Sequence, residues 1–361
     1  MADRTTERRW LEQLTSLPTA PGHEGRVMDW ARSWAGRRSD LSARGDRHGN
    51  LVITQKGRKS KSPVVAAAHT DHPGFIVEAV DRRRVEVGFR GGVRAPYFES
   101  ARVELFDSGD GAHRGRLVEY DPESGSGVVR LDRAGELAPG DIGRFAFQGR
   151  AEGKGEIHAP AHDDLAGVAA ALAALDRARA RPGLRHFGVL LTRAEEVGFV
   201  GAIAAARSGT LAPDTRVLSI ECSRSFADSP IGGGPIIRVG DASSVFDHAL
   251  TNLITGAVRA DGLRHQRKLM AGGSCEATAF VAYGYAAAGL CLPLGNYHNM
   301  GNLDQVEQGN GEAVPKPEVV SIDDYHGLVD LLLVAAEGVD GDSGLRERIE
   351  RRFESESWIL E

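Results

Sequence analysis

The sequence predicts an α/β fold that is interrupted by an all-β segment. Continuous apolar strands alternate with amphipathic helices near both ends of the chain, a pattern typical of a sheet covered on both faces. Between about Gly74 and Lys154 the chain instead carries short strands with period-two alternation, separated by clusters of Gly, Asp and Pro. At roughly 150 residues per domain, a chain of 361 residues is long enough for two domains. We therefore expect an α/β domain made of residues 1–74 and 155–361, with an inserted β domain at 75–154.

The elements before the insertion follow from the spacing of apolar residues. Apolar side chains recur at helical spacing between Thr5 and Leu17, and the pair Pro21-Gly22 ends that pattern. The run from Pro63 to Ala68 is continuously apolar, which suits a strand with both faces buried. The expected elements are helices at 5–17 and 24–34 and strands at 50–54 and 63–68.

The same reasoning applies to the rest of the chain. Within the insertion, alternation predicts strands at 84–87, 102–106, 128–131 and 145–147. Beyond it, the expected helices lie at 166–178, 198–207, 276–283, 321–339 and 344–358, and the expected strands at 186–192, 216–220 and 286–292. The segment from Asn299 to Lys316 is rich in Gly, Asn and Gln and is expected to be a mobile loop.

Composition argues against several classes of function. Acidic residues outnumber basic ones by 50 to 44, and the net charge of −6 disfavours a nucleic-acid binder with a basic face. No run approaches the ~18 apolar residues that span a membrane, and the charged start of the chain lacks a signal-peptide core. The three cysteines cannot form a disulfide framework. We therefore expect a cytoplasmic protein that binds neither nucleic acid nor membrane.

Side chains that bind metals recur directly after the predicted strands. His69 follows the apolar run, and Asp71 can hold its second ring nitrogen, as carboxylates often do for metal-bound histidines. Alone, a His-x-Asp pair is more often structural. Asp163 and Asp164 precede a predicted helix, where an acid can cap the helix or bridge two cations, and capping is the better explanation for Asp164.

Two adjacent glutamates, Glu195 and Glu196, follow the strand at 186–192. Like charges this close are costly unless a positive group lies beside them. A pair of metal ions would supply that charge, with one Glu as ligand and the other as general base. The competing interpretation is a pair of first-turn carboxylates favoured by a helix dipole.

Two further candidates complete the set. Glu221 follows the strand at 216–220, and His298 comes after the strand at 286–292; each alone would more often be structural. Together, however, two histidines and three carboxylates suit two Zn²⁺ or Co²⁺ ions, or Mn²⁺, that share one bridging carboxylate. Two ions roughly 3.5–4 Å apart can activate a water and polarise a carbonyl.

With these motifs the sequence resembles the cytosolic glutamyl/tetrahedral aminopeptidases, co-catalytic metallopeptidases that assemble into hollow dodecamers. The resemblance covers nearly the whole chain. Leu14 to Trp34, Gly49 to Leu51 and Gln266 to Ala277 are similar to family segments. The segments closest to the family motifs are His69 to Phe75, similar to His-Met-Asp-Glu-Ile-Gly-Phe, Asp163 to Gly167, similar to Asp-Asp-Arg-Ala-Gly, and Glu195 to Gly198, identical to Glu-Glu-Val-Gly.

The resemblance implies a fold, a set of site residues and an activity. The fold would be a mixed-sheet, di-zinc exopeptidase-like catalytic domain with a small barrel or PDZ-like insertion that serves dimerisation and assembly. The activity would be removal of N-terminal residues from peptides by a water held between two metal ions, in dimers that build a dodecamer. The implied roles are one metal on Asp163, Glu196 and His298, the other on His69, Asp163 and Glu221, Glu195 as general base and Asp71 as support for His69.

Several positions depart from the family pattern. The usual Ser-Pro-x-Glu does not follow His298 directly, and Asn299 to Pro317 resembles an insertion. These changes affect the expected substrate preference and assembly, but they remove no implied ligand. The substituted positions are Glu221 in place of Asp, Leu165 in place of Arg, Glu276 in place of Asp and His72 in place of Glu. His162, next to the bridging acid, is better explained by a supporting or structural role than as a further ligand.

Two other functions stay open at this point. One is a two-metal amidohydrolase or deacylase of small N-acyl compounds, which would use the same ligands with a different pocket. The other is a non-catalytic, metal-stabilised assembly protein, which would hydrolyse no peptide.

Overall fold

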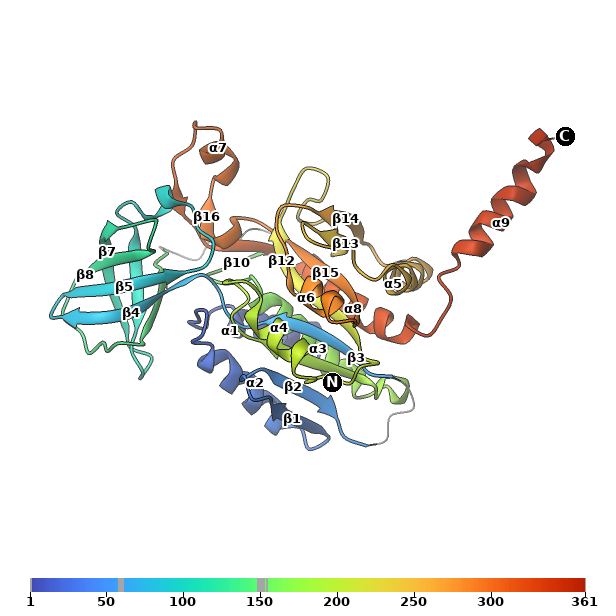
Figure 1. The fold of residues 1–361 in the computed structure, drawn as a ribbon, viewed down its shortest axis with the longest axis horizontal. Coiled ribbons are helices and arrows are strands. Elements are labelled where there is room, and N and C mark those ends of the chain that lie inside the picture. Colours follow the sequence, from blue (N-terminus) through green and yellow to red (C-terminus); the bar gives the residue numbers. More distant parts are fainter. Residues whose placement is uncertain (1, 58–61, 148–152, 154, 361) are drawn as a thin grey trace.

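An eight-stranded mixed sheet forms the centre of the larger lobe of the molecule (Figure 1). The computed structural model describes residues 2–57, 62–147, 153 and 155–360. In sheet order, the strands are β1 (Leu41–Gly45), β2 (Leu51–Gln55), β11 (Phe187–Thr192), β3 (Val64–His69), β12 (Arg216–Arg224), β15 (Ala286–Leu294), β13 (Ile236–Asp241) and β14 (Gln266–Met270).

The middle of this sheet is parallel. Strands β11, β3, β12 and β15 are parallel neighbours, and antiparallel β2 and β13 flank them. Every residue of β3 and β11 is buried, as their apolar sequences predict. Because the carboxyl ends of parallel strands meet at one edge of a sheet, the residues that end these four strands are brought together there.

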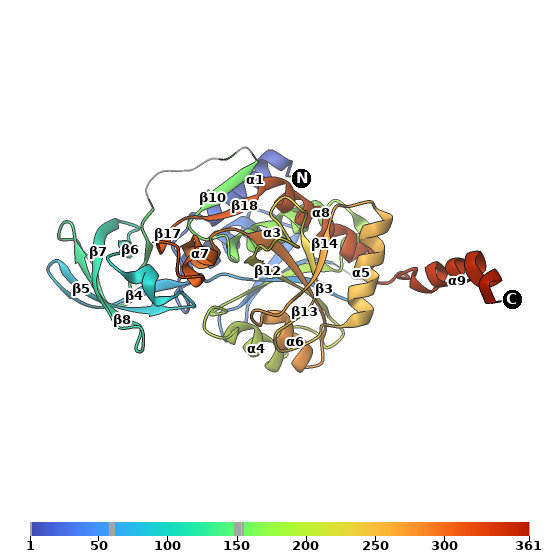
Figure 2. The ribbon, with the colours of Figure 1, turned by 90° about the horizontal axis from the view of Figure 1, so that it is seen from above.

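Helices cover both faces of the sheet, as Figure 2 shows. Helix α3 is alanine-rich and almost completely buried, since its small side chains allow close packing against the sheet, α1 and α8. None of the helices in the described part of the chain combines the length and apolar character needed to cross a bilayer. One face carries α1 (Arg4–Leu14), α2 (Gly25–Gly36), α3 (Leu165–Ala178), α5 (His248–Ala260) and α8 (Ile322–Gly338), and the other carries α4 (Val200–Arg207) and α6 (Glu276–Ala282).

A closed β-barrel forms the smaller lobe (Figure 1). Aromatic rings fill its interior: the Phe89 ring lies 4.9 Å from the Phe75 ring and 4.8 Å from the Phe98 ring, in edge-on contacts. Barrel closure comes from the antiparallel pairing of its first and last strands. In barrel order, the strands are β4 (Gly74–Asp81), β5 (Arg84–Arg90), β8 (Ser126–Leu131), β7 (Ala112–Tyr120), β6 (Arg102–Phe106) and β9 (Ile142–Phe145).

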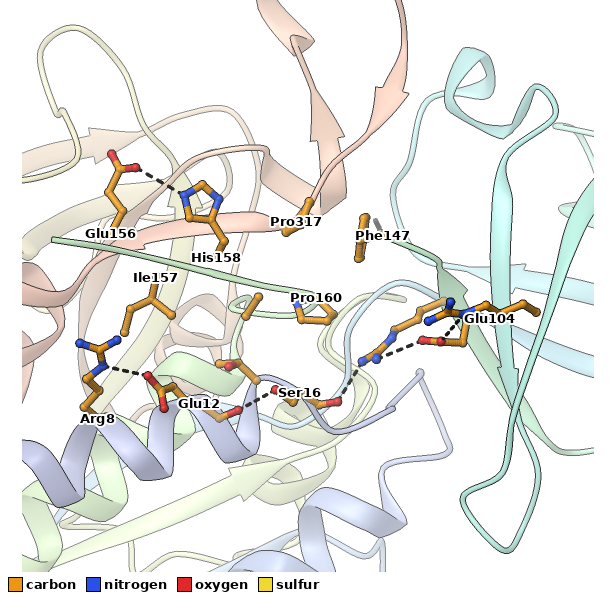
Figure 3. Close-up of a pocket in the computed structure, with 14 residues that line it drawn as sticks. Arg8, Glu12, Ser16, Glu104, Phe147, Glu156, Ile157, His158, Pro160 and Pro317 are labelled. Carbon is orange, nitrogen blue, oxygen red and sulfur yellow. Dashed lines mark hydrogen bonds and ion pairs between the residues drawn. The ribbon is translucent and has the colours of Figure 1, made fainter. Parts of the chain in front are cut away.

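A cleft of about 400 Å³ separates the barrel from the helical side of the larger lobe. Figure 3 shows Ser16 and Glu104 among the residues that line it. The guanidinium of Arg144, in β9, donates to the Ser16 carbonyl (2.9 Å) and to the Glu104 carboxylate (3.3 Å), so that one side chain ties the barrel to the turn after α1. After the barrel the chain returns through β10 (Glu156–Ala159), which pairs with β18 (Glu318–Ser321). The expected end of the insertion, Lys154, lies outside the described residues.

The segment expected to be a loop at 299–316 is instead a small folded unit, which we call the inserted lobe. It contains β16 (Met300–Gly301), α7 (Leu303–Glu307) and β17 (Val314–Pro315). Its ends are adjacent, because the Lys316 amide donates to the Asn299 carbonyl at 2.8 Å. Its apolar residues pack on Tyr97 of the barrel lobe, whose hydroxyl donates to the Gly301 carbonyl. The Gly-rich composition did not predict this folded unit, because long-range contacts rather than a local pattern hold it together.

Candidate metal centre

The sequence-predicted site residues converge at the carboxyl edge of the parallel strands. His69 is the last residue of β3, and Glu195 and Glu196 follow β11 within four residues. Glu221 lies inside β12, directly beside Cys291 of β15, and His298 follows β15 in the short helix η3 (Tyr297–Asn299). His69 and His298, which are more than 200 positions apart in the sequence, thus lie at the same edge of the sheet.

Four groups of described side chains in this cluster have the spacing to hold a metal ion, and two of them combine Asp163 with a histidine. In the first, His69 Nε2 lies 3.3 Å from Asp163 Oδ1 and 3.4 Å from Glu221 Oε1. In the second, His298 Nε2 lies 3.5 Å from Asp163 Oδ2 and 3.2 Å from Glu196 Oε2. Each oxygen of Asp163 therefore faces a different histidine, which is the arrangement expected of a bridging carboxylate.

The chemistry of the cluster fits divalent cations. Asp163 Oδ1 and Glu196 Oε1 are buried and have no hydrogen-bond partner among the described residues. Burial, together with the nearby charge of Asp163, raises the pKa of Glu221 to about 8. Burial alone would lower the pKa of His69, but its contacts with Asp163 and Asp71 raise it well above its usual value. The carboxylates of this cluster therefore favour a positive charge between them, and metal ions would provide that charge.

Asp71 is positioned differently from the expected support for His69. Its carboxylate lies 3.6 Å from His69 Nδ1, beyond hydrogen-bond distance, while that nitrogen is 3.2 Å from the Asp71 backbone carbonyl. The two carboxylate oxygens of Asp71 instead accept the backbone N–H groups of Glu195 and Glu196, each at 3.0 Å. Asp71 therefore orients both the histidine, through its main chain, and the Glu-Glu pair, through its side chain.

Glu195 lies on the open side of the cluster. It is half-buried and forms a group of potential ligand atoms with His69 and Glu196. Burial, followed by the charge of Glu221, raises its pKa well above the usual value for a glutamate. Glu195 lines a cavity of about 790 Å³ that also reaches His298, the barrel segment from Gly91 to Arg94 and the inserted lobe at Met300, Leu303 and Glu307.

Glu318 is a site residue that sequence reasoning missed. Its buried carboxylate accepts three backbone N–H groups, from His162 (2.7 Å), Asp163 (3.0 Å) and His298 (2.9 Å). It therefore joins the loop of the bridging acid to the loop of His298. The inserted lobe hides the motif that would have identified Glu318. Without the lobe, Pro317-Glu318 would closely follow His298 and Asn299 in the sequence. That order is similar to the Ser-Pro-x-Glu that follows the histidine in the family pattern.

His72, which replaces a Glu of the family pattern, holds Asp163 from the other side. Its Nδ1 lies 2.7 Å from the Asp163 carbonyl, and its Nε2 lies 3.1 Å from Asn299 Oδ1. The Asn299 amide is oriented by two carbonyl acceptors, Pro160 and Lys316, so that its oxygen faces the ring. Both ring nitrogens of His72 thus face oxygen atoms, and the ring links the bridging acid to Asn299.

His162 lies outside the groups of potential metal ligands. Its Nε2 donates to the Ile157 carbonyl at 2.9 Å, and burial lowers its pKa to about 3. The Cys222 thiol donates to the His162 carbonyl at 3.3 Å, and burial raises its pKa well above the usual value. Cys222 forms a further group of potential ligand atoms with Asp163 and Asp164, but it does so as a buried thiol rather than as a charged ligand.

Comparisons with known proteins point to one family. A family model described as M42 glutamyl aminopeptidase matches residues 129–309. A curated protein of Acetivibrio thermocellus is 24% identical over 283 residues, which are 70% of this chain and 80% of that protein.

Solved structures share the fold over almost the whole chain. The aminopeptidase APDkam598 of the archaeon Desulfurococcus kamchatkensis superposes with a TM-score of 0.76 at 21% identity, over 94% of this chain and 96% of that one. The Pyrococcus horikoshii TET1 peptidase superposes with a TM-score of 0.74 at 20% identity, over 91% and 99%. With the match of the family model to half of its length, the chain belongs to the M42 family of aminopeptidases, and its activity is hydrolysis of peptide bonds.

Proposed function

We propose that this chain is a metal-dependent aminopeptidase whose centre holds two divalent cations that share Asp163. The observation that carries the proposal is the position of Asp163, whose two oxygens face His69 and His298 at 3.3 and 3.5 Å. Glu221 would complete the first ion's ligands and Glu196 the second's. Imidazole and carboxylate ligands suit Zn²⁺ or Co²⁺, and Mn²⁺ is compatible with them. When bound, such ions polarise a carbonyl and increase the acidity of a water.

Glu195 is the general base in this proposal. It lies beside both metal-binding groups, lines the cavity and is not needed as a ligand in either group. Burial raises its pKa above the usual value for a glutamate, which makes it a stronger base. Glu195 takes a proton from the attacking water and returns it to the leaving amine. The hydrogen bonds from the Glu195 and Glu196 amides to Asp71 fix the backbone positions of the base and of the adjacent ligand.

The domain roles follow the same proposal. Residues 1–74 and 155–361 would form the catalytic domain, and 75–154 the inserted domain for dimerisation and assembly. The Pyrococcus horikoshii TET1 peptidase assembles into a tetrahedron or a large octahedral shell. We propose that this chain likewise self-associates, first into dimers and then into a dodecamer. The PDZ-like description of the barrel and the cytoplasmic location remain sequence-based expectations.

A substrate panel with metal removal and replacement tests the function. The protein, before and after treatment with a chelator, is assayed on aminoacyl-nitroanilides, dipeptides and N-acetyl amino acids, and Zn²⁺, Co²⁺ or Mn²⁺ is then added back. We expect turnover of the substrates with a free amino group, loss of activity on chelation and recovery with metal. Faster hydrolysis of the N-acetyl compounds would favour the amidohydrolase alternative, and full activity in the chelator would contradict the metal-dependent mechanism.

A further inference from the structure

Tyr297 lies at the edge of the metal centre, and the mechanism proposed above does not use it. It directly precedes His298, and its ring stacks on the His298 ring with the centroids 3.8 Å apart and the planes at 22° to each other. Tyr297 also lines the cavity of about 790 Å³, together with Asp163 and Glu195. The phenol therefore shares this cavity with the bridging acid and with the general base.

The backbone around Tyr297 fixes the position of its ring. Asn296 and His298, on either side of it, have φ angles of 52° and 51°, in the left-handed region that few non-glycine residues adopt. Such a backbone persists only where its surroundings hold it. The Asn296 side chain donates to the Pro317 carbonyl at 2.8 Å, and the His298 amide donates to the Glu318 carboxylate at 2.9 Å. The ring also packs against apolar side chains of the larger lobe and of the inserted lobe.

The Tyr297 hydroxyl makes no hydrogen bond to any residue that the structure describes, and it is not sealed from the cavity. A buried tyrosine usually finds a partner for its hydroxyl. Other donors of the cavity wall are less available. Arg94 and Arg224 are both paired with Glu307. The unpartnered Nε of Arg238 is buried away from the cavity. Tyr297 therefore offers a neutral donor beside the metal centre.

A donor that is fixed in place and unpaired is suited to a charge that appears only during the reaction. Hydrolysis of a peptide bond places negative charge on the carbonyl oxygen while the intermediate is tetrahedral. Preorganised donors stabilise such a charge well, because no existing hydrogen bond has to break when the charge develops. An ordinary phenol is protonated at neutral pH, so the hydroxyl of Tyr297 can donate.

We propose that the Tyr297 hydroxyl donates a hydrogen bond to the oxygen of the scissile carbonyl in the transition state, as a further catalytic residue. This role rests on the proposed aminopeptidase function. As the water oxygen bonds to the carbonyl carbon, the π-electron pair of the carbonyl moves to its oxygen, and Glu195 takes a proton from the water. Tyr297 keeps its own proton throughout. When the electron pair returns, the C–N bond breaks and Glu195 gives its proton to the leaving amine.

The variant Tyr297→Phe tests this role, because phenylalanine keeps the ring that stacks on His298 and removes only the hydroxyl. A hydrogen bond to a charged oxygen that forms only in the transition state should contribute about 10–100-fold. We expect kcat and kcat/KM for a peptide substrate to fall together by this factor, with KM nearly unchanged. Metal content and thermal unfolding should match those of the parent chain, since the ring and the proposed ligands are retained.

Binding of a tetrahedral analogue gives a readout that does not depend on turnover. An α-aminophosphonic acid has tetrahedral, charged oxygens, as the transition state does, whereas the amino acid with the same side chain is a planar product. Calorimetry should show that Tyr297→Phe binds the phosphonic acid about 10–100-fold more weakly and binds the amino acid with nearly the parent affinity. An equal loss of affinity for both compounds would overturn the proposed role.

The variant Tyr283→Phe is the matched control. Tyr283 is 47% exposed and does not line the cavity at the metal centre, so this variant should match the parent chain in every measurement. If the parent chain is active, an unchanged kcat in Tyr297→Phe, or a higher KM alone, would overturn the role of Tyr297 and leave the proposed function intact. A parent chain that hydrolyses no peptide would overturn the proposed function and this role together.

Discussion

Helix α3 has a buried aspartate near each end, and the surroundings of these two carboxylates shift their pKa values in opposite directions. Near the end of the helix, Asp176 accepts hydrogen bonds from Arg38 (2.7 Å), Arg179 (2.8 Å) and the Ala2 amide (2.8 Å). Burial would raise the pKa of Asp176, but these partners outweigh it and lower the pKa. At the start of the helix, Asp164 has a buried oxygen without a partner, and burial raises its pKa well above the usual value.

This difference distinguishes acidic residues that stabilise the fold from acidic residues that could bind a cation. Asp176 is neutralised by its own chain, so folding alone explains it. The acids around Asp164 are not neutralised in this way, because Asp163 and Glu196 also have buried oxygens without hydrogen-bond partners among the described residues. Buried charge that the protein leaves uncompensated is costly, and the cluster is therefore best explained by a cation that binds there. The predictions below test this contrast.

The largest effect is expected for the general base. In Glu195→Gln the side chain keeps its size but cannot accept a proton, so turnover should fall by about 10²–10⁴-fold. Metal content should not change, because Glu195 is not in either ligand set that shares Asp163. Steady-state kinetics with elemental analysis measures both quantities. Asp176→Asn is the matched control and should keep turnover; near-normal turnover in Glu195→Gln would exclude the assigned role.

Stability should depend on pH in opposite directions for Glu276, the first residue of α6, and for Asp176 of α3. Burial raises the pKa of Glu276, beside the cluster, to about 7. A folded-state pKa above the unfolded value means that the wild-type protein loses stability as the pH rises from about 4.5 to about 7. Glu276→Gln removes this loss, so the variant should be more stable by about 3 kcal/mol at pH 8 and nearly equal to wild type at pH 4.5. Denaturant unfolding of the metal-free protein across this range is the measurement.

Asp176→Asn should show the reverse sign in the same series. Because the pKa of Asp176 is lowered by folding, its charged form stabilises the protein above the unfolded pKa and that contribution fades as the pH falls through the folded value. The variant should lose about 1–3 kcal/mol at pH 7 and progressively less below about pH 4. The same sign for both variants would mean that Glu276, beside the cluster, and Asp176 do not differ as described.

Glu318→Gln should have a smaller effect, on metal affinity more than on chemistry. The amide can no longer accept on both sides, so at least one of the N–H groups of His162, Asp163 and His298 loses its acceptor. Groups that orient metal ligands typically contribute about 10–100-fold in affinity. We expect a loss of that size in a metal titration, with turnover largely recovered at saturating metal. Glu312→Gln, on the exposed side of the inserted lobe, is the control, and an unchanged affinity in Glu318→Gln would exclude the positioning role.

Local patterns were sufficient for much of the fold. The predicted strand at 102–106 coincides with β6, and the predicted helix at 166–178 differs from α3 by one residue. Edge strand β1 was missed, because Leu41–Gly45 has only one buried residue and no alternation. Strands β13 and β14 were also missed, since β13 is recognised mainly by its pairing with β15. Helix α5 was missed although Leu250, Ile254 and Val258 recur at helical spacing in it.

The site was predictable where a side chain directly follows a strand. His69 and the Glu195-Glu196 pair fall under that rule, and the structure brings them together with Asp163, Glu221 and His298. Glu318 was not predictable in this way, because the inserted lobe separates it from His298 by 20 positions. The backbone role of Asp71 was also hidden, since a sequence pattern shows which acid is near a histidine but not which hydrogen bonds the acid accepts.

The central claim is that Asp163 joins two metal ions, one with His69 and one with His298. Elemental analysis of the purified protein and of His69→Ala and His298→Ala tests it most directly. We expect two divalent ions per chain in the parent protein and a loss of bound metal in each variant, with folding checked by thermal unfolding. Full metal content in both folded variants would contradict the shared two-metal centre.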